Sequence, residues 1–138
     1  MPNPLTPEER EKLLEEGASL LARRKFFEAH EAFEDLWKGT GAQAERDIWQ
    51  GMAQIAAALV KHERGESASA ITLLAKARTR LTGSGLLRDS GEILTAYLDR
   101  LAMPVTCERD LPGASLDPAL LARLRKLLRE RAAGSPLS

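Results

Sequence analysis

The stretch of sequence from Lys25 to Lys38 reads KFFEAHEAFEDLWK and holds four of the six aromatic residues in the chain. On a helix, which turns by about 100° per residue, its apolar side chains fall on one face, made of Phe26, Ala29, Phe33 and Trp37. His30 lies on that face, and Glu34 lies at its edge one turn later. A histidine and a carboxylate in this arrangement are either a buried pair whose polar atoms hydrogen-bond to each other, or part of a functional site.

The length and composition place the chain among globular proteins with a single domain. Its 138 residues are enough for one hydrophobic core, and 43% of them are hydrophobic. Twenty basic residues balance twenty acidic ones, which argues against nucleic acid or an acidic polymer as the partner. The single cysteine, Cys107, excludes an internal disulfide and a multi-cysteine metal site.

Nothing in the sequence indicates a membrane protein or a secreted one. The longest apolar run, from Ile55 to Val60, is far too short to span a bilayer, and the first residues contain no apolar leader segment. We therefore expect a cytoplasmic protein. Residues 1–138 are expected to form one domain, with frayed tails at 1–5 and 133–138 and a long loop at 104–116 before the last helix.

Helix signals dominate the chain, and strand signals are nearly absent. Thr6-Pro7-Glu8-Glu9 provides an N-cap, a proline at the first helical position and a capping-box glutamate. The segment Gly39-Thr40-Gly41 ends the aromatic helix. The apolar spacing predicts helices at about residues 7–24, 25–38, 44–64, 66–81, 91–103 and 118–132. The sequence thus predicts an all-α fold, a single-domain bundle of about six helices built from antiparallel helical hairpins.

The second and third expected helices are joined by a short turn, which predicts an antiparallel hairpin. If Trp37 lies level with Ala44, then His30 falls beside Gly51, and polar groups from both helices meet at a common height. The expected polar cluster consists of His30, Glu31, Glu34, Trp37, Arg46, Gln50 and Gln54. Three physical uses of this cluster compete.

The first use is a metal site, because His30-Glu31-x-x-Glu34 is similar to the zincin His-Glu-x-x-His pattern with its second histidine replaced. His30 and Glu34 would be ligands, Asp47 is the nearest further carboxylate, and Glu31 is the candidate catalytic base. His62 lies about 12 Å farther along the helix axis than the cluster. We interpret it as a solvated residue near a helix end.

The second use is a buried structural network, in which Glu34 pairs with Arg46 and His30 bonds to Glu34 or to a glutamine amide. The third use is a pocket for a small molecule or a peptide. Its expected lining residues are Phe27, Trp37, Trp49, His30, Glu34 and Gln54. The residues by themselves leave these three interpretations open.

Two local charge blocks interrupt the neutral total. Between Glu8 and Glu16 there are five glutamates against two basic residues, and from Pro118 onward there are five basic residues against Glu130. The basic block is either a contact helix for an acidic partner or RNA, or a solvated face whose charges suit a helix C-terminus. We favour the solvated face, because no aromatic residues interleave the basic ones for base stacking.

Two family resemblances follow from these motifs. Residues 56–77 are similar to tetratricopeptide-type helical hairpins, with small residues, a glycine turn and an alanine-containing second helix. The pattern Phe27-x-x-His30-Glu31-x-x-Glu34-x-x-Trp37, followed by Arg46 and Gln50-Gly51-x-x-Gln54, resembles the domain of unknown function family 309 (DUF309). That resemblance covers about residues 13–81 and implies a compact all-α domain of prokaryotic type. A metal-dependent hydrolase label accompanies the family and rests on the His-Glu motif.

The sequence therefore predicts a helical binding or scaffold module with a polar cluster between its second and third helices. A homodimer is an expected partner, since exposed apolar residues of small helical domains find symmetric partners. A small molecule or peptide is the expected ligand, and no cofactor is expected. The alternative is a metal-dependent hydrolase, which would hold a divalent metal with His30 and Glu34 and use Glu31 as its base.

Overall fold

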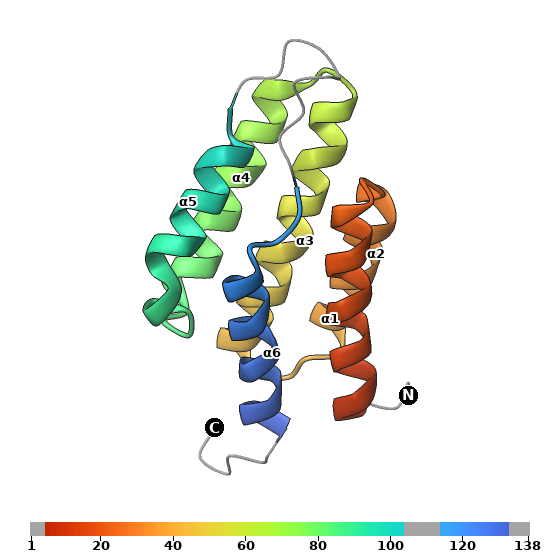
Figure 1. Ribbon diagram of the computed structural model, residues 1–138, viewed down its shortest axis with the longest axis vertical. Coiled ribbons are helices and arrows are strands. Elements are labelled where there is room, and N and C mark those ends of the chain that lie inside the picture. The colour runs from red at the N-terminus through yellow and green to blue at the C-terminus, as the bar shows by residue number, and fades with distance from the viewer. Residues whose placement is uncertain (1–4, 104–113, 133–138) are drawn as a thin grey trace.

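The computed structural model describes residues 5–103 and 114–132. Within these ranges the chain forms six α-helices, one short 3-10 helix and no β-strand (Figure 1), which confirms the all-α prediction. The elements are α1 (Pro7–Ala22), α2 (Phe26–Lys38), α3 (Gln43–Glu63), α4 (Ser67–Gly83), η1 (Arg88–Ser90), α5 (Gly91–Leu101) and α6 (Pro118–Ala132). The predicted tails, apart from residue 5, and most of the predicted loop at 104–116 lie outside the described residues.

The first helix begins where its capping signal predicts. The Thr6 hydroxyl accepts a hydrogen bond from the Glu9 backbone N–H at 3.1 Å, and the Glu9 carboxylate accepts one from the Thr6 backbone N–H at 2.9 Å. This capping box satisfies two backbone donors that a helix end otherwise leaves free. None of the helices in the described ranges has both the length and the apolar character that a membrane crossing requires.

Consecutive helices from α1 to α4 pack as antiparallel hairpins, and α3 lies between α2 and α4 (Figure 1). Two glycines allow the close approach. A Cβ added at Gly17 of α1 would lie 2.7 Å from the Phe33 ring of α2, and one at Gly51 of α3 would lie 2.8 Å from the Leu81 side chain of α4. The expected position of Gly51 beside His30 is therefore wrong, because this glycine faces α4 rather than α2.

The core lies where the helices face one another. Its largest fully buried side chains come from all of the first five helices and are Leu14, Leu21, Phe26, Phe33, Leu36, Ile48, Trp49, Met52, Ile55, Leu59, Leu81 and Tyr97. Because α3 packs on both neighbours, it contributes five of these and forms the centre of the molecule. A central helix of this kind also holds the candidate site residues of α3 in a fixed position relative to α2 and α4.

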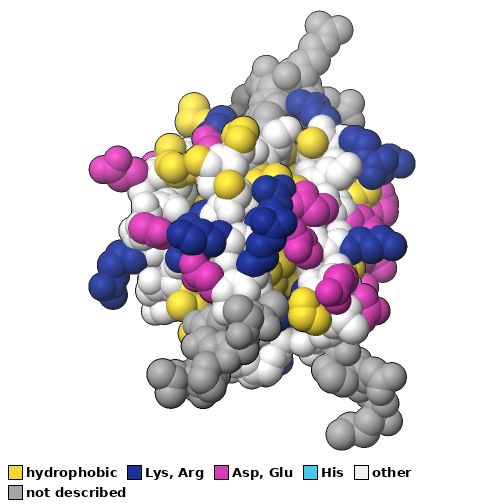
Figure 2. All heavy atoms as spheres, turned by 60° about the horizontal axis from the view of Figure 1, so that its bottom comes forward, with side chains coloured by type: hydrophobic (Ala, Val, Ile, Leu, Met, Phe, Trp, Pro, Cys, Tyr) yellow, Lys and Arg dark blue, Asp and Glu magenta, His cyan; other side chains and the backbone are white. Residues whose placement is uncertain are grey.

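The two charge blocks of the sequence pair with each other. Arg125 of α6 donates to Glu15 of α1 at 2.6 Å, and Arg129 donates to Glu11, also at 2.6 Å. Figure 1 shows α6 beside α1, and in Figure 2 Lys/Arg and Asp/Glu side chains interleave over the lower end of the molecule. The basic side chains stay partly or largely exposed, as a solvated face predicts, and in addition Arg125 and Arg129 join α6 to α1.

His62 at the end of α3 is buried, with 2% of its surface exposed. Its Nε2–H donates to the Leu101 carbonyl at the end of α5, 3.0 Å away, and its Nδ1 lies 3.3 Å from the Ser67 hydroxyl of α4. The interpretation of His62 as a solvated residue is thus wrong. The reason is tertiary: the last residue of α5 and the first residue of α4 both reach the ring nitrogens.

Candidate functional site

The charged residues of the α2 motif bond along their own helix. Glu34 accepts from the Lys38 ammonium at 2.8 Å and lies 3.2 Å from Nε2 of His30, both one helical turn away. The Lys38 hydrogen bond lowers the pKa of the Glu34 carboxyl below its ordinary value, and this effect outweighs the opposing effect of partial burial. His30 and Glu34 are 30% and 34% exposed, so the pair is open to solvent on one side.

Phe27 is the large apolar residue of α2 that packing leaves outside the core. It is 56% exposed, and its ring lies against His30, with 6.5 Å between the ring centroids. The neighbouring Phe26, by contrast, is 1% exposed. A phenylalanine in this position contributes little to the core and leaves an apolar contact surface beside the His30–Glu34 pair.

Arg46 reaches from α3 to α2 and lies over the Trp37 ring, 5.5 Å from its centroid. Both residues are half-buried, and the Nε atom of Arg46 is buried without a hydrogen-bond partner among the described residues. The expected ion pair between Glu34 and Arg46 does not form, because Glu34 bonds within α2. The predicted hairpin thus brings Arg46 to α2, but to an aromatic ring rather than to a carboxylate.

The remaining motif residues of α3 lie toward α4 or toward solvent. Asp47 pairs with Arg80 of α4 at 3.1 Å and also accepts from Gln43 at 3.1 Å. Gln54 lines a groove of about 460 Å³ together with Asp47, Lys76, Thr79, Arg80 and Gly83. Gln50 is half-buried, and its amide bonds to no described residue.

We use the name motif face for the solvent side of α2 and α3, defined by Phe27, His30, Glu34, Trp37, Arg46, Gln50 and Gln54. Glu31, the candidate base, is exposed on α2 beside it. Over residues 5–103 and 114–130, no three His, Cys, Asp or Glu side chains come close enough to hold a metal ion together. His30, Glu34 and Asp47 are accordingly not gathered around one point. Trp49 is fully buried, so it does not line a pocket with Phe27.

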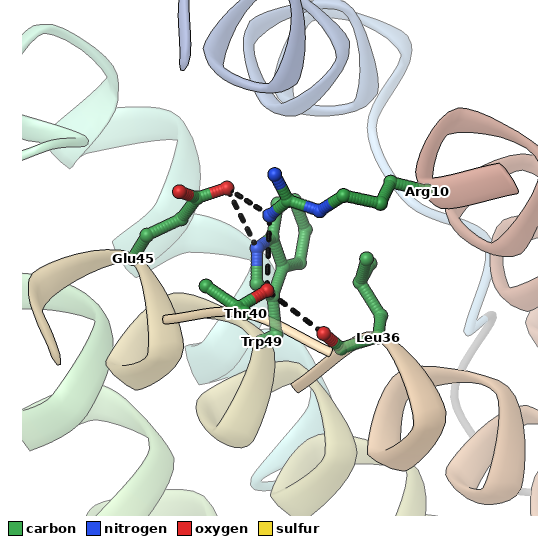
Figure 3. Close-up of polar contacts among 5 residues, drawn as sticks. All are labelled: Arg10, Leu36, Thr40, Glu45 and Trp49. Atoms are coloured by element: carbon green, nitrogen blue, oxygen red, sulfur yellow. Dashed lines mark hydrogen bonds and ion pairs between the residues drawn. The ribbon is translucent and has the colours of Figure 1, made fainter. Parts of the chain in front are cut away.

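A second polar cluster, which the sequence reasoning missed, is buried between α1 and α3 (Figure 3). Arg10 donates to Glu45 and, at 2.9 Å, to the Thr40 hydroxyl, and the indole N–H of Trp49 lies 3.4 Å from the same Glu45 oxygen. Thr40 in turn donates to the Leu36 carbonyl at 2.8 Å. Glu45 shares a helix side with Ile48, Trp49 and Met52, and this acidic residue on an apolar side was the signal available in the sequence.

A groove larger than the one beside Gln54 has a different lining. It encloses about 760 Å³ between α1 and the turn after α2, and its lining includes Leu5, Glu9, Lys12, Leu13, Glu16, Asp35, Lys38, Gly39, Thr40 and Gly41. Carboxylates and ammonium groups are mixed along it, and it is open to solvent. Size therefore does not identify it as the functional site, and the unsatisfied polar atoms of the motif face are the more informative feature.

The fold and the motif face define a class of protein, a small all-α domain of antiparallel helical hairpins with a polar outer face on its second and third helices. Residues 14–73 match the family DUF309, described as a domain of unknown function, which confirms the resemblance drawn from the motif. An uncharacterized protein of Bacillus subtilis (strain 168), YpuF, is 39% identical over 54 residues. That alignment covers 39% of this chain and 31% of the relative. No solved structure matches the chain significantly.

Proposed function

We propose that the chain is a helical binding module whose partner docks on the motif face. The state of Arg46 carries this proposal. Six arginines of the described residues are half-buried, and five of them pair with carboxylates: Arg10, Arg78, Arg80, Arg123 and Arg125. Arg46 is the sixth, and it lies on Trp37 with no carboxylate beside it.

An unpaired, half-buried guanidinium supports a binding role for a physical reason. Removing a charge from water costs free energy unless an opposite charge or good acceptors replace the water. Stacking on an aromatic ring also holds the planar fork of donors in one orientation, ready for a carboxylate or phosphate. Arginine and tryptophan are the residue types on which binding energy concentrates at protein interfaces. The exposed Phe27 adds an apolar contact on the same face.

The cellular setting of the module also belongs to this proposal. One cysteine in 138 residues suits the reducing cytoplasm, and the related Bacillus protein suits a prokaryotic source. Self-association into a homodimer stays a prediction that sedimentation measurements test. A scaffold or binding role does not need a catalytic group.

Site-specific photo-crosslinking tests the proposal. A photoreactive phenylalanine analogue placed at position 27 is expected to capture a discrete partner in the cells of the source organism. The matched control places the same analogue at position 71, because Ile71 of α4 is also an exposed apolar residue, at 41%. The capture at position 27 is expected to disappear with Arg46→Ala. Identical crosslinks from both positions, or capture that ignores Arg46→Ala, would contradict the proposal.

A metal-dependent hydrolase is the alternative, and one observation favours it. The imidazole of His30 and the carboxylate of Glu34 lie 3.2 Å apart on a solvent-open helix side, in the spacing that lets two side chains share one ion. Glu31 would then act as the general base and Asp47 would have to leave Arg80 to become a third ligand.

Metal analysis discriminates between the two functions. The hydrolase alternative predicts near-stoichiometric zinc, manganese or iron in the purified protein and its loss in the variant His30→Ala. His62→Ala is not a suitable control, because His62 is buried in the fold. Glu31→Gln serves instead: it is expected to keep the metal and lose only hydrolysis. Protein that takes up no metal when zinc chloride is titrated into it would exclude this alternative.

A further inference from the structure

The solvent side of α3 carries a row of three hydrogen-bonding side chains at a constant spacing of four residues: Arg46, Gln50 and Gln54. All three are half-buried, and none forms a hydrogen bond or an ion pair through its side chain with any described residue. Two of the four buried side-chain atoms that lack a partner in the described part of the chain are Nε of Arg46 and Oε1 of Gln54. The other two atoms belong to Arg10 and Arg123, which both pair with a carboxylate through another nitrogen, so the row differs in having no such partner.

The spacing of the row fits the repeat of an extended polypeptide. Four residues of helix rise by about 6 Å, and two residues of an extended chain rise by about 6.6 Å. A glutamine amide has one carbonyl acceptor and an N–H donor group, which are the same functions as in a peptide group. Two glutamines four residues apart on a helix can therefore bond to every second peptide group of a strand that runs along the helix.

We propose that this row binds a peptide segment in extended conformation. Gln50 and Gln54 pair with the backbone peptide groups of the segment, Gln54 after its buried Oε1 atom has turned outward, and Arg46 binds a carboxylate that the segment carries. This assignment rests on the proposed binding function and names the chemistry of the partner. The carboxylate comes from the C-terminus of the segment or from an acidic side chain, since both present the same two oxygens to the guanidinium fork.

The surroundings of the row differ on its two sides. On the α2 side lie the rings of Phe27 and Trp37, whereas on the α4 side lies the groove with the Asp47–Arg80 pair and the Lys76 ammonium. Successive side chains of an extended segment point to opposite sides. The bound segment therefore alternates apolar and polar residues. Its apolar side chains face α2, and its polar side chains face α4.

The charge content of the row selects a peptide over a single-stranded nucleic acid. A nucleic acid carries one phosphate per nucleotide, so a groove that follows its backbone needs a cation at each repeat. The row has one cation, Arg46, and two neutral amides. Peptide groups are neutral, and one carboxylate in the segment matches the single arginine.

Affinity selection with the purified full chain tests the inference. The probes are two synthetic pools of random heptapeptides, one with free C-termini and one amidated, and the captured sequences are read by mass spectrometry. We expect enrichment of acidic sequences with alternating apolar and polar residues. Arg46→Ala is expected to weaken a selected peptide about 10-fold or more, and Gln50→Leu or Gln54→Leu about 2- to 10-fold each.

Two matched controls are available in the chain. Arg100 also lies over an aromatic ring, 5.2 Å from the centroid of Tyr97, so Arg100→Ala controls for the loss of a stacked arginine. Gln43 lies on α3 outside the row and already donates to Asp47, so Gln43→Leu controls for the loss of an amide. Neither variant is expected to change peptide affinity. Arg46→Lys keeps the positive charge but lacks the planar guanidinium with its two parallel donors, so it is expected to lose most of the peptide affinity.

The outcomes separate this inference from the proposed function. An affinity that falls on amidation assigns the carboxylate to the C-terminus, and one that falls only when an acidic side chain is replaced assigns it to that side chain. If neither pool is enriched, or if the three row variants leave the affinity of the enriched peptides unchanged, the peptide inference is overturned. The proposed function survives that result if position 27 still captures a partner dependent on Arg46, and fails if it does not.

Discussion

Arg10 stabilises the contact between α1 and α3 only while Glu45 keeps its negative charge beside it. The side chains are 13% and 5% exposed, so neither charge is well solvated in the folded protein. In such a pair the attraction roughly repays the cost of removing both charges from water, while removal of one partner leaves the other uncompensated. Thr40 and Trp49 add hydrogen bonds that fix the geometry.

Replacement of Glu45 by leucine is expected to destabilise the protein strongly. The variant leaves the Arg10 guanidinium buried without a counter-charge, and the cost is about 3–5 kcal/mol in the free energy of unfolding. Urea denaturation measures it. The double variant Arg10→Met, Glu45→Leu removes both charges and is expected to recover most of the loss. A double variant as unstable as Glu45→Leu would contradict this explanation.

Tyr97, the single tyrosine, is expected to make folding sensitive to alkaline pH. Burial raises the pKa of its hydroxyl above the ordinary value, and the hydroxyl donates to the Ala114 carbonyl at 2.7 Å. Since the folded-state pKa is the higher one, this contribution to stability is complete below about pH 10 and is lost as the pH rises toward the folded-state pKa.

Ultraviolet absorbance of the phenolate measures this titration without interference from other tyrosines. In concentrated guanidinium chloride the absorbance is expected to rise at about pH 10. In the native protein it is expected to rise only at higher pH, together with the loss of helical circular dichroism. A native titration near pH 10 with helicity retained would show that the hydroxyl is accessible.

At the scale of elements, local sequence signals and close contacts explain most of the fold. The predicted start of the first helix and the end of the second helix at Gly39 agree with the structure to within a residue, because capping and glycine chemistry are local. The contact partners of each helix are not local. They depend on small residues that let two helix axes approach, of which Gly17 and Gly51 are the clearest cases.

Gly17→Ala is expected to destabilise the α1–α2 hairpin. The new methyl group would lie 2.7 Å from the buried Phe33 ring, so α1 must shift, at a cost of about 1–3 kcal/mol. Gly83→Ala is the matched control, because this helical glycine has no heavy atom within 4 Å of the added Cβ. This control is expected to raise the free energy of unfolding by about 0.4–1 kcal/mol, because alanine lowers the conformational entropy of the unfolded chain. Thermal denaturation compares the two variants. If both raise or both lower the melting temperature, the explanation by contact with Phe33 is contradicted.

At the scale of the whole molecule, α3 serves both the core and the motif face. Its inner side holds Trp49 and Met52, and its outer side holds the row with unsatisfied polar atoms. Such atoms lower stability, because a buried acceptor loses its hydrogen bonds to water and gains none in the protein. A protein that keeps them trades stability for function.

Gln54→Leu is therefore expected to raise the free energy of unfolding by about 1 kcal/mol while it weakens peptide binding. The substitution removes the buried Oε1 atom and keeps a side chain of similar size. Gln43→Leu is expected to give no such gain, because the Gln43 amide is exposed and already bonded to Asp47. Urea denaturation of both variants decides the matter; a loss of stability in Gln54→Leu would mean that its amide has a partner in solution.

Only the contacts within a single helix of the candidate site could be predicted from the sequence. The i, i+4 spacing of His30 and Glu34 predicts their contact, and the structure places them 3.2 Å apart. The partners across helices were not predictable in the same way. The rotation of α3 about its own axis decides whether Gly51 faces α2 or α4. No short-range sequence signal sets this rotation, because it depends on how the helices pack against each other.

The sequence by itself determined the all-α class, the helix boundaries to within about two residues and the His30–Glu34 contact within α2, because capping, periodicity and i, i+4 contacts depend on neighbours in the chain. The tertiary structure alone decided that Arg46 lies on Trp37, that Glu45 is buried with Arg10, and that His62 bonds to the end of α5. These outcomes depend on how side chains of several helices fill one core together. The helix from Phe26 to Lys38 thus supplies the motif, and its packing against α3 determines which polar groups remain for a partner.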